Sequence, residues 1–315
     1  MEIENTIDLR TGMVNAFIRA VEQNKNFVVL VSDSVSTSKI KPFKDKYPDR
    51  LVNVGIAEQN LVGIAAGMAL GGFIAVTCNA APFLIARSHE QVKNDICYSN
   101  TNVKLVGLNA GFAYGPLAAT HHAIDDIAVM RTLGNILILA PADPVETEQI
   151  FDFAIDYTGP VYIRLDNAKF PVLHDNNYTF KCGDPDVLTN GPDVCVFAVG
   201  SVVQNAFKAA LQLETKEISP TVVNCSSIRP VNKKKLATIA AKFKQIITVE
   251  EHSVNGGLGS LIAEVIAENG LHSKLTRLGI HDGEFAKAGP RNELQAFYKI
   301  DQNGIKSVIQ NVLKY

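Results

Sequence analysis

A single acidic residue, Glu58, lies near the start of a stretch of small and apolar residues, VGIAEQNLVGIAAGMALGG. The stretch is apolar on nearly every side of a helix, so we expect a helix over about 56–71 that is buried on most faces. A carboxylate in such surroundings costs several kcal/mol unless it is paired or protonated. Glu58 could instead be an ordinary first-turn acid that complements the helix dipole, which is worth about 1 kcal/mol at most. From the residues alone, a functional carboxyl group and a helix-stabilising one are equally good interpretations.

Short β-branched runs alternate with helical patterns in the first half of the chain. We expect strands at 27–32, 73–78, 103–109, 136–141 and 161–165. We expect helices at 10–24, 56–71, 83–99, 122–132 and 144–157. Continuous apolar strands separated by helices indicate a parallel sheet covered on both faces, so the fold class is predicted to be doubly wound α/β. Glu58 would then lie in a crevice between a strand and a helix, where such folds bind ligands.

A segment rich in Asn, Asp, Gly and Pro, residues 167–192, interrupts this alternation and is typical of a linker. After it we expect a second, smaller α/β domain with strands at 194–199, 221–225, 246–250 and 275–279. Its helices are expected at 201–213, 232–243 and 256–269, with two more at the C-terminus. The predicted division is a first domain at 1–170, a linker at 171–190 and a second domain at 191–315.

The composition excludes several classes of protein. The chain has 315 residues, 47% of them hydrophobic and 20% charged, as in globular proteins of about two domains. A net charge of -2 provides no basic field for nucleic acid or anionic lipid. The N-terminus is unlike a signal peptide and no segment reaches the ~20 apolar residues of a membrane span, so we expect a cytoplasmic protein. The five cysteines form no CxxC pair, which favours buried free thiols over a metal site or disulfides.

The segment around Glu58 resembles the pyrimidine-binding domain of transketolases and related enzymes that use thiamine diphosphate. The resemblance continues in the same order through PFLIARSHEQVKNDI, THHAIDDIAVMRT, ILILAPADPVETEQ, GPVYIRLDNAKFP and VEEHSVNGGLGS. The most specific strings are GIAEQ, HAIDDIA and EEHxxxGGLGS, the last of which lies in the second domain and resembles the transketolase C-terminal domain. The resemblance implies a transferase that moves a two-carbon ketol unit from a ketose phosphate to a sugar acceptor.

The resemblance assigns cofactor-binding roles to residues of the first domain. In the family, the acid matching Glu58 bonds N1′ of the cofactor's aminopyrimidine, and the resulting 4′-imine removes the proton from thiazolium C2. Such a carboxyl group must hold a proton near neutral pH, so we expect burial to raise its pKa. The other cofactor-binding positions implied are Asp33, Phe83 and Arg87. A helix cap for Asp33 and a plain core ring for Phe83 are the simpler alternatives.

Substrate-binding roles follow from the same resemblance. His121 matches the family histidine near the reacting carbons, where an imidazole can move a proton. His122 replaces the usual glutamine, so which of the two imidazoles acts stays open, although a structural role for His122 is favoured. Arg10, Thr37 and Arg164 match positions that hold the sugar phosphate, and a surface ion pair or cap would explain each of them equally well.

The loop GLNAGFAYGPLAATHH departs from the family pattern. It has Asn109 and the pair Pro116-Leu117 where transketolases carry an extra histidine and acidic residues that contact the acceptor. Because a leucine cannot bond a hydroxyl group, we expect Leu117 to favour an acceptor that is less polar at the matching carbon. Ribose 5-phosphate should then be a poor acceptor, and the anionic group of the true one could be a phosphate or a nucleotide diphosphate.

The second departure is the absence of the GDG motif and the spaced Asn pair that hold Mg²⁺ (or Ca²⁺) and the diphosphate in thiamine enzymes. The nearest match, His281-Asp282-Gly283, lacks the Asn partner. Since the chain begins about ten residues before its first predicted helix, we expect a second polypeptide to carry this motif. The sequence thus resembles the C-terminal subunit of a split transketolase. We expect a dimer of this chain to bind two partner subunits as an α2β2 complex.

Three alternatives stay open. The nearest is another thiamine enzyme, either a β subunit of a 2-oxo acid dehydrogenase or part of a deoxyxylulose-phosphate synthase, and HAIDDIA and the linker favour transketolase over both. A non-catalytic interaction subunit is less compatible with the retained Glu58, and a plain nucleotide-binding module lacks a GxGxxG motif or P-loop. In the second domain, the glycine turn at 256–260 could bind an anion but more often only packs closely, and His252 is expected to be an interface or core histidine.

Overall fold

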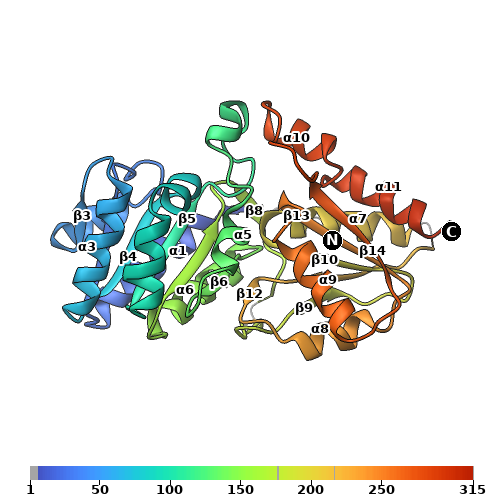
Figure 1. The fold of residues 1–315 in the computed structure, drawn as a ribbon, viewed down its shortest axis with the longest axis horizontal. Coiled ribbons are helices and arrows are strands. Elements are labelled where there is room, and N and C mark those ends of the chain that lie inside the picture. Colours follow the sequence, from blue (N-terminus) through green and yellow to red (C-terminus); the bar gives the residue numbers. More distant parts are fainter. Residues whose placement is uncertain (1–5, 176, 216, 315) are drawn as a thin grey trace.

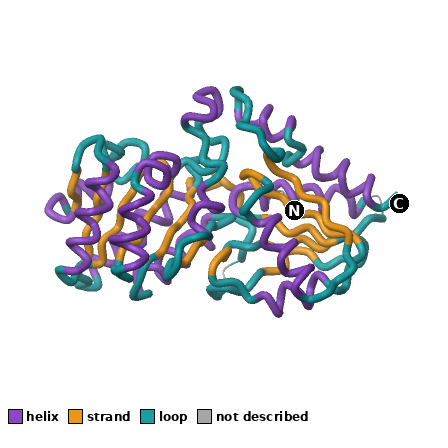
Figure 2. The backbone as a smooth tube through the Cα atoms, in the orientation of Figure 1, coloured by secondary structure: helices purple, strands orange, loops and turns teal. Residues whose placement is uncertain are grey.

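The computed structural model describes residues 6–175, 177–215 and 217–314. Two α/β units lie side by side, one made of the blue to green elements and the other of the yellow to red ones (Figure 1). In each unit, strands form a central sheet with helices packed around it (Figure 2). The predicted α/β fold class is confirmed.

The larger sheet has seven strands in the order β12-β6-β7-β5-β4-β2-β3. They are β2 (Phe27–Val31), β3 (Leu51–Asn53), β4 (Ile74–Ala80), β5 (Val103–Leu108), β6 (Leu137–Leu139), β7 (Val161–Leu165) and β12 (Ser227–Arg229). All neighbours are parallel except β12, which is antiparallel to β6. The chain adds β3 on one side of β2 and then β4 on the other. The carboxyl ends of β2 and β4 therefore form the topological switch point of the sheet, where such folds bind ligands.

Helices cover both faces of this sheet. They are α1 (Leu9–Glu22), α2 (Lys41–Lys46), α3 (Glu58–Leu70), α4 (His89–Gln91), α5 (Asp126–Arg131) and α6 (Pro144–Asp156). Alternate residues of β2 face opposite cores, because Val28 and Leu30 belong to the cluster of α3 whereas Val29 and Val31 belong to that of α1 and α6. No helix in the described ranges is long and apolar enough to cross a membrane.

The segment predicted as one helix at 83–99 is irregular. It forms two π-helical stretches, η2 (Phe83–Arg87) and η3 (Val92–Tyr98), on either side of the short α4. A π-helical turn inserts an extra residue and so rotates the side chains that follow it, and such turns are frequent at functional sites. Phe83 and Arg87 are the first and last residues of η2, so this irregular turn determines the directions in which their side chains point.

The smaller sheet has the order β14-β13-β10-β11-β9. Its strands are β9 (Asp186–Thr189), β10 (Cys195–Ala198), β11 (Thr221–Asn224), β13 (Gln245–Ser253) and β14 (Lys274–Ile280). Its helices are α7 (Val203–Glu214), α8 (Lys233–Ala240), α9 (Leu258–Glu268), α10 (Arg291–Phe297) and α11 (Gln302–Val312). A separate antiparallel pair joins β1 (Thr6–Asp8) to β8 (Lys169–Pro171). The predicted linker 171–190 therefore ends in a strand of the second sheet.

The two units share structure at their junction. Strand β12 comes from the second half of the chain, yet it completes the first sheet beside β6. Arg291 of α10 donates from Nη1 to Asp166, which follows β7, at 2.8 Å and from Nε to Glu251 of β13 at 2.9 Å. These groups are largely buried, so removing one partner would leave an uncompensated charge. The units are thus held by a shared sheet and a buried ion-pair network, and the division at 171–190 stays a prediction.

Candidate active site

A cavity of about 310 Å³ opens at the switch point between β2 and β4. Its walls come from the loop after β2, the segment that leads into α3, the end of β4 with η2, and the loop before the 3-10 segment η4 (Gly115–Thr120). The lining residues are Ser32, Asp33, Ser34, Thr37, Ile56, Glu58, Asn79, Ala80, Phe83, Arg87 and Tyr114. Five positions implied by the sequence resemblance meet here, namely Asp33, Thr37, Glu58, Phe83 and Arg87.

Glu58 is the buried acid of this cavity, with 3% of the residue exposed. Its Oε2 accepts a hydrogen bond from Nη1 of Arg87 at 2.6 Å. Burial acts to raise the pKa of Glu58, but the Arg87 guanidinium, the helix-start backbone and the Asn79 amide outweigh it, so the pKa lies below its usual value. The expected rise in pKa is therefore wrong for this state of the chain. The sequence predicted the burial of Glu58, but not the contact between its carboxyl group and Arg87.

His121 belongs to an aromatic group at the side of the cavity. Its ring centroid lies 5.1 Å from that of Phe83 and 5.3 Å from that of Tyr114, both nearly perpendicular to it. The Thr120 hydroxyl is 2.9 Å from Nδ1 of His121, a contact that orients the imidazole. The structure thus brings His121 next to Phe83 and Tyr114, both of which line the cavity.

His122 points away from these rings into the protein. Only 2% of the residue is exposed, and its Nε2 donates to the Gly115 carbonyl at 2.8 Å. Burial lowers the pKa of this imidazole, which keeps it neutral. Of the two neighbouring histidines, His121 is therefore the one on the cavity side, and its proton-transfer role stays a prediction.

The loop that carries both histidines is strained at Ala118. This residue has φ 60° and ψ −159°, a region that is almost exclusive to glycine. Its carbonyl accepts the backbone N–H groups of His121 at 2.9 Å and of His122 at 3.0 Å. Strain of this kind persists only where the surroundings enforce it. Here it fixes the backbone that places the His121 imidazole beside the rings of Phe83 and Tyr114, although His121 itself is not a lining residue of the cavity.

We expect Ala118→Gly to stabilise the chain by about 1 kcal/mol, because glycine adopts this backbone conformation without the clash that alanine suffers. Ala119→Gly is the matched control, since Ala119 lies in the same segment without a positive φ. The control should lose roughly 0.5 to 1 kcal/mol through the greater flexibility of the unfolded chain. Urea unfolding of both variants measures the difference, and an Ala118→Gly variant less stable than wild type would show that the loop is not strained.

The carboxyl ends of β2 and β4 bring further polar groups to the cavity. Asp33 is exposed, has a left-handed φ of 54°, and donates its backbone N–H to Oδ1 of Asn53 at 3.0 Å. Asn79 is 4% exposed and its Oδ1 accepts the Ala80 N–H at 2.8 Å, whereas its Nδ2 has no hydrogen-bond partner in the described parts of the chain. This amide is near enough to Glu58 to lower the pKa of that carboxyl group but forms no hydrogen bond with it, so the buried donor is available to a ligand. Asn79 was missed from the sequence, although its place at the end of a strand beside the switch point was a usable signal.

The structure does not bring Arg10 and Arg164 to the cavity. Arg10 is buried, and its guanidinium donates to both Asp8 carboxylate oxygens, at 2.9 and 2.7 Å, and to two backbone carbonyls. Arg164 is also buried, pairs with Asp126 at 2.9 Å, and donates to two further backbone carbonyls. These donors are already engaged inside the protein and neither residue lines this cavity, so the phosphate-binding role expected for both stays a prediction.

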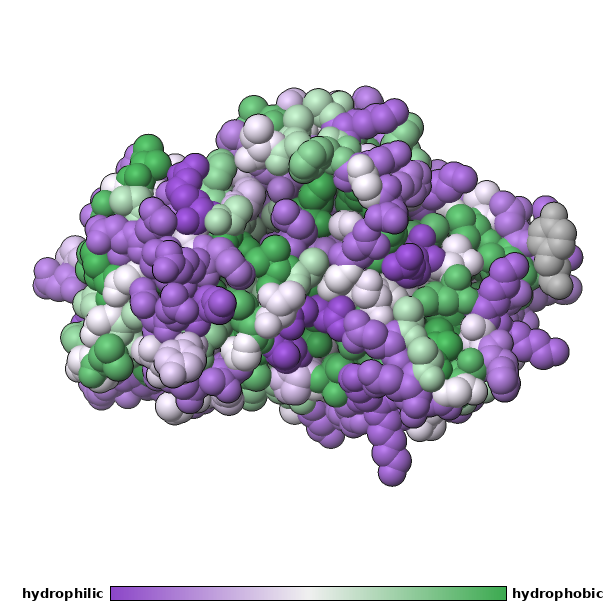
Figure 3. Space-filling model, in the orientation of Figure 1, coloured by the Kyte–Doolittle hydropathy of each residue, from purple (hydrophilic) through white to green (hydrophobic). Residues whose placement is uncertain are grey.

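Leu117 also lies away from the cavity wall. It is half exposed on η4, a segment that projects from the top of the molecule in Figure 1. Apolar side chains gather over this part of the surface (Figure 3). Leu117 is not a lining residue of the cavity, so any influence on the acceptor would act from outside the pocket of this chain.

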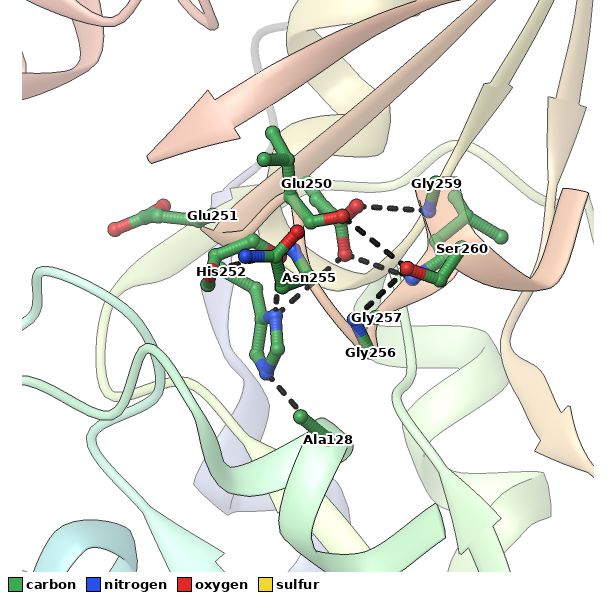
Figure 4. A network of polar contacts seen from close by, with 12 residues as sticks. Ala128, Glu250, Glu251, His252, Asn255, Gly256, Gly257, Gly259 and Ser260 are labelled. Carbon is green, nitrogen blue, oxygen red and sulfur yellow. Dashed lines mark hydrogen bonds and ion pairs between the residues drawn. The ribbon is translucent and has the colours of Figure 1, made fainter. Parts of the chain in front are cut away.

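The glycine turn at 256–260 is already filled by a carboxyl group of the protein itself. The buried Glu250 accepts the backbone N–H groups of Leu258 and Gly259 at the start of α9, both at 2.7 Å (Figure 4). A Cβ built on Gly257 would lie 1.9 Å from Oε2 of Glu250, so the glycine makes room for the carboxyl group. The backbone donors of this turn are therefore engaged by Glu250, and no external anion is needed there.

His252 lies beside Glu250 and is fully buried (Figure 4). Its Nδ1 donates to the Ser253 carbonyl at 2.7 Å and its Nε2 accepts the Ala128 N–H at 3.3 Å, which is the pattern of a neutral imidazole. Burial raises the pKa of Glu250 to about 7 and lowers that of His252 to about 4. His252 is a core histidine, as its sequence context predicted.

Comparison with known proteins decides the family. Residues 5–171 match the model of the transketolase pyrimidine-binding domain, and residues 183–305 match that of the transketolase C-terminal domain. The chain belongs to the transketolase family. The members of this family use thiamine diphosphate.

Two similar proteins match this transketolase chain over nearly its whole length. A protein from Actinobacillus succinogenes, named as one of the subunits of an apulose-4-phosphate transketolase, is 54% identical over 96% of this chain and 97% of its own length. A putative transketolase C-terminal section from Methanocaldococcus jannaschii is 35% identical over 97% of this chain and 96% of its own length. The prediction of a C-terminal subunit of a split transketolase is confirmed.

Solved structures of transketolases agree with this assignment. A structure described as a split gene transketolase, inactive beta4 tetramer, has a TM-score of 0.87 and 34% identity and covers 98% of this chain and 99% of that one. The transketolase of Campylobacter jejuni has a TM-score of 0.81 at 16% identity, which shows the fold alone. This chain matches only 47% of that longer protein.

The cavity of this transketolase chain fits one end of the cofactor. A buried carboxyl group, an aromatic ring and an unpartnered amide suit a flat heterocycle with ring nitrogens. Across the described ranges, no group of three or more His, Cys, Asp or Glu side chains is placed to hold a metal ion. Arg87 is the one cation among the lining residues and is already paired with Glu58. The residues therefore fit the pyrimidine and not the metal-bound diphosphate.

Proposed function

We propose that this chain binds the pyrimidine end of thiamine diphosphate and that its partner subunit, which carries the GDG motif, binds the diphosphate and Mg²⁺ or Ca²⁺. The observation that carries the proposal is the buried Glu58 carboxyl group in one cavity with the Phe83 ring, at the switch point of the sheet. The nearest match to the GDG motif in the sequence, His281-Asp282-Gly283, lacks the Asn partner, which supports the division of labour between two chains. When bound, the cofactor supplies the nucleophilic carbon that the reaction needs.

The residues of the cavity would have separate tasks. Protonated Glu58 would donate to a ring nitrogen of the pyrimidine, and Phe83 would pack against the ring face. Asp33 lies at the same cavity and would contact the cofactor from the loop after β2. His121 stands beside Phe83, where it would exchange a proton with a substrate oxygen. Thr37 is the phosphate-binding position of the resemblance that does line the cavity.

We propose a ketose phosphate as the donor, and apulose 4-phosphate in particular. The support is the relative that is 54% identical over 97% of its length and has this sugar in its name. In the reaction, the bond between the ketol carbons and the rest of the donor breaks, and the two-carbon unit forms a new bond to the carbonyl carbon of an aldehyde acceptor. No feature of the cavity favours the deoxyxylulose-phosphate synthase reaction over this one.

Reconstitution tests the proposal. This chain and the candidate partner are purified separately, mixed with thiamine diphosphate and Mg²⁺, and assayed for ketol transfer from apulose 4-phosphate. We expect activity only in the mixture, and an α2β2 mass by size-exclusion chromatography with light scattering. A self-dimer of this chain would form the centre of that complex. Full activity of this chain alone would contradict the need for a partner.

Substrate preference is measured on the same complex. We expect a higher kcat/KM for apulose 4-phosphate than for standard ketose phosphates, and poor transfer to ribose 5-phosphate beside a panel of deoxy and nucleotide-linked acceptors. If ribose 5-phosphate proves the best acceptor at ordinary efficiency, the complex is a general transketolase and the apulose assignment is wrong. The partner requirement would stand in either case.

A further inference from the structure

Arg87 contacts both residues that the proposed function gives to the pyrimidine. Its Nη1 donates to Oε2 of Glu58 at 2.6 Å, and its guanidinium carbon lies 5.0 Å from the centre of the Phe83 ring. The first contact occupies the carboxyl group that would otherwise bond a ring nitrogen of the pyrimidine. The second is a cation–π contact with the Phe83 ring, which would pack against the pyrimidine. The Arg87 guanidinium therefore makes contacts that the pyrimidine of the cofactor would need.

The charge of Arg87 also opposes the task of Glu58. A carboxyl group that donates a proton to a ring nitrogen has to be protonated, whereas a guanidinium at hydrogen-bond distance favours the carboxylate. Both conditions cannot hold at once for the same acid. The ion pair and the bound pyrimidine are thus alternative states of one site.

We propose that Arg87 is a positioning residue that leaves Glu58 when the pyrimidine enters, so that Glu58 takes up a proton as the cofactor binds. The inference rests on the proposed function above. The proton comes from solvent, and the guanidinium keeps its charge and moves toward the mouth of the cavity. Arg87 thus sets the protonation state of Glu58, a role different from the cofactor-binding one that the sequence resemblance implies for it.

Arg87 is free to make this movement. Its side chain is 51% exposed, whereas the Glu58 side chain is 3% exposed, so the pair is anchored on one side only. A half-exposed ion pair contributes little free energy, because water screens the attraction between the two charges. Arg10 and Arg164 are the contrasting cases, since each is buried and held by several hydrogen bonds. Of these three arginines, only Arg87 can exchange its partner at low cost.

Few other groups can take over the influence of Arg87 on Glu58. In the cavity, Asp33 comes from the loop after β2 and Tyr114 from the loop before η4, and neither is a cation at neutral pH. The ionisable groups of α4 and η3, which pack against α3, form no ion pair with Glu58; they are His89, Glu90, Lys93 and Asp95. Once Arg87 has moved, only the Asn79 amide and the backbone at the helix start still lower the pKa of Glu58. Burial then dominates and raises the pKa of the carboxyl group.

Calorimetry on the reconstituted complex tests this exchange. Thiamine diphosphate with Mg²⁺ is titrated at about pH 8 into the complex in two buffers of different ionisation enthalpy, which gives the number of protons taken up. We expect the wild type to take up close to one proton per site and Glu58→Gln to take up none. Arg87→Met should bind the cofactor more tightly, by about fivefold at most, because the cofactor no longer has to displace the guanidinium from Glu58 and a partly exposed ion pair contributes little.

Two further variants complete the design. Arg87→Lys keeps the positive charge and should stay close to wild type in affinity. Arg19→Met is the matched control, because Arg19 forms partly exposed ion pairs with Glu148 and Asp152 and does not line the cavity. It should leave both affinity and proton uptake unchanged.

The outcomes separate the inference from the proposed function. Tighter binding by Arg87→Met together with proton uptake by the wild type supports the exchange. Weaker or unchanged binding by Arg87→Met, or no proton uptake by the wild type, overturns it while leaving the cofactor assignment intact. A wild-type complex that does not bind thiamine diphosphate at all overturns the proposed function, and the inference with it.

Discussion

Glu58→Gln should lower the turnover of the reconstituted enzyme by several powers of ten. Glutamine has the shape of a protonated glutamate and can hydrogen-bond the same ring nitrogen, but it cannot give up or regain the proton. Losing such a proton transfer costs about 10²- to 10⁴-fold in rate, and losing a preorganised group at the reacting centre adds to it. Cofactor affinity should be retained or should rise, since glutamine also removes the carboxylate that binds Arg87. The measurements are kcat and the Kd for thiamine diphosphate.

The control for this variant is Glu90→Gln. Glu90 lies on α4, close in sequence to the cavity residues but exposed and outside the lining. It should keep near wild-type turnover, because it loses one solvated charge and nothing else. If Glu58→Gln also keeps near wild-type turnover, Glu58 is not the proton-holding group and the cavity needs another assignment.

Glu250→Gln should make the stability of the chain strongly dependent on pH between about 4 and 6.5. In the folded chain, Glu250 keeps its proton up to about pH 7 and His252 stays neutral down to about pH 4. In the unfolded chain they titrate near their ordinary values of about 4.3 and 6.5. Between those two values the pair therefore holds one proton in either state, on Glu250 when folded and on His252 when unfolded. The wild-type pair contributes almost no pH dependence in this window.

The variant removes this balance. With glutamine at position 250, the folded pair holds no proton in the window, whereas unfolded His252 still binds one. The unfolded state then binds more protons, so stability rises with pH by about 1.4 kcal/mol per unit, on the order of 3 kcal/mol over the window. Urea unfolding of the isolated chain at several pH values measures the slope.

His252→Gln is the opposite test of the same pair. It leaves only Glu250, whose pKa is raised on folding, so the folded state binds more protons and stability should fall as pH rises from about 4.5 to about 7. The free energy of unfolding could instead change with pH in the same direction in both variants, or not change in either. Each of these results would show that the wild-type pair does not hold one proton in both the folded and the unfolded state.

The sequence predicted the parts of the site that depend on local order. Glu58 begins a helix and Asp33 follows a strand, and parallel α/β topology brings such ends together at one edge of the sheet. The Glu58–Arg87 pair could not be predicted, because the direction of Arg87 depends on the π-helical turn η2, whereas the apolar pattern of 83–99 is that of an ordinary helix. The pKa of Glu58 was mispredicted for the same reason.

Arg10 and Arg164, which lie outside the cavity, show a different limit. An arginine at a motif position can bind a ligand or form an ion pair within the protein. Which of the two it does depends on the carboxylates that lie near it in space. For Arg10 the competing acid is only two residues away, at Asp8, but for Arg164 it is Asp126, which belongs to another element. Strand β12 was missed for a similar reason, since its three residues have no apolar run and gain their conformation from β6, far back in the chain.

The position of β12 has a consequence for how the protein is synthesised. The ribosome releases β6 long before Ser227–Arg229 can pair with it, and translation adds only about 5 to 20 residues per second. For that interval the nascent first sheet has an open edge, and such edges are templates for pairing with other chains. A fragment cut at the 171–190 segment would keep this edge open permanently. The smallest piece that closes the first sheet therefore extends past Arg229, so the C-terminal half acts in part as a folding cap for the half that holds the cavity.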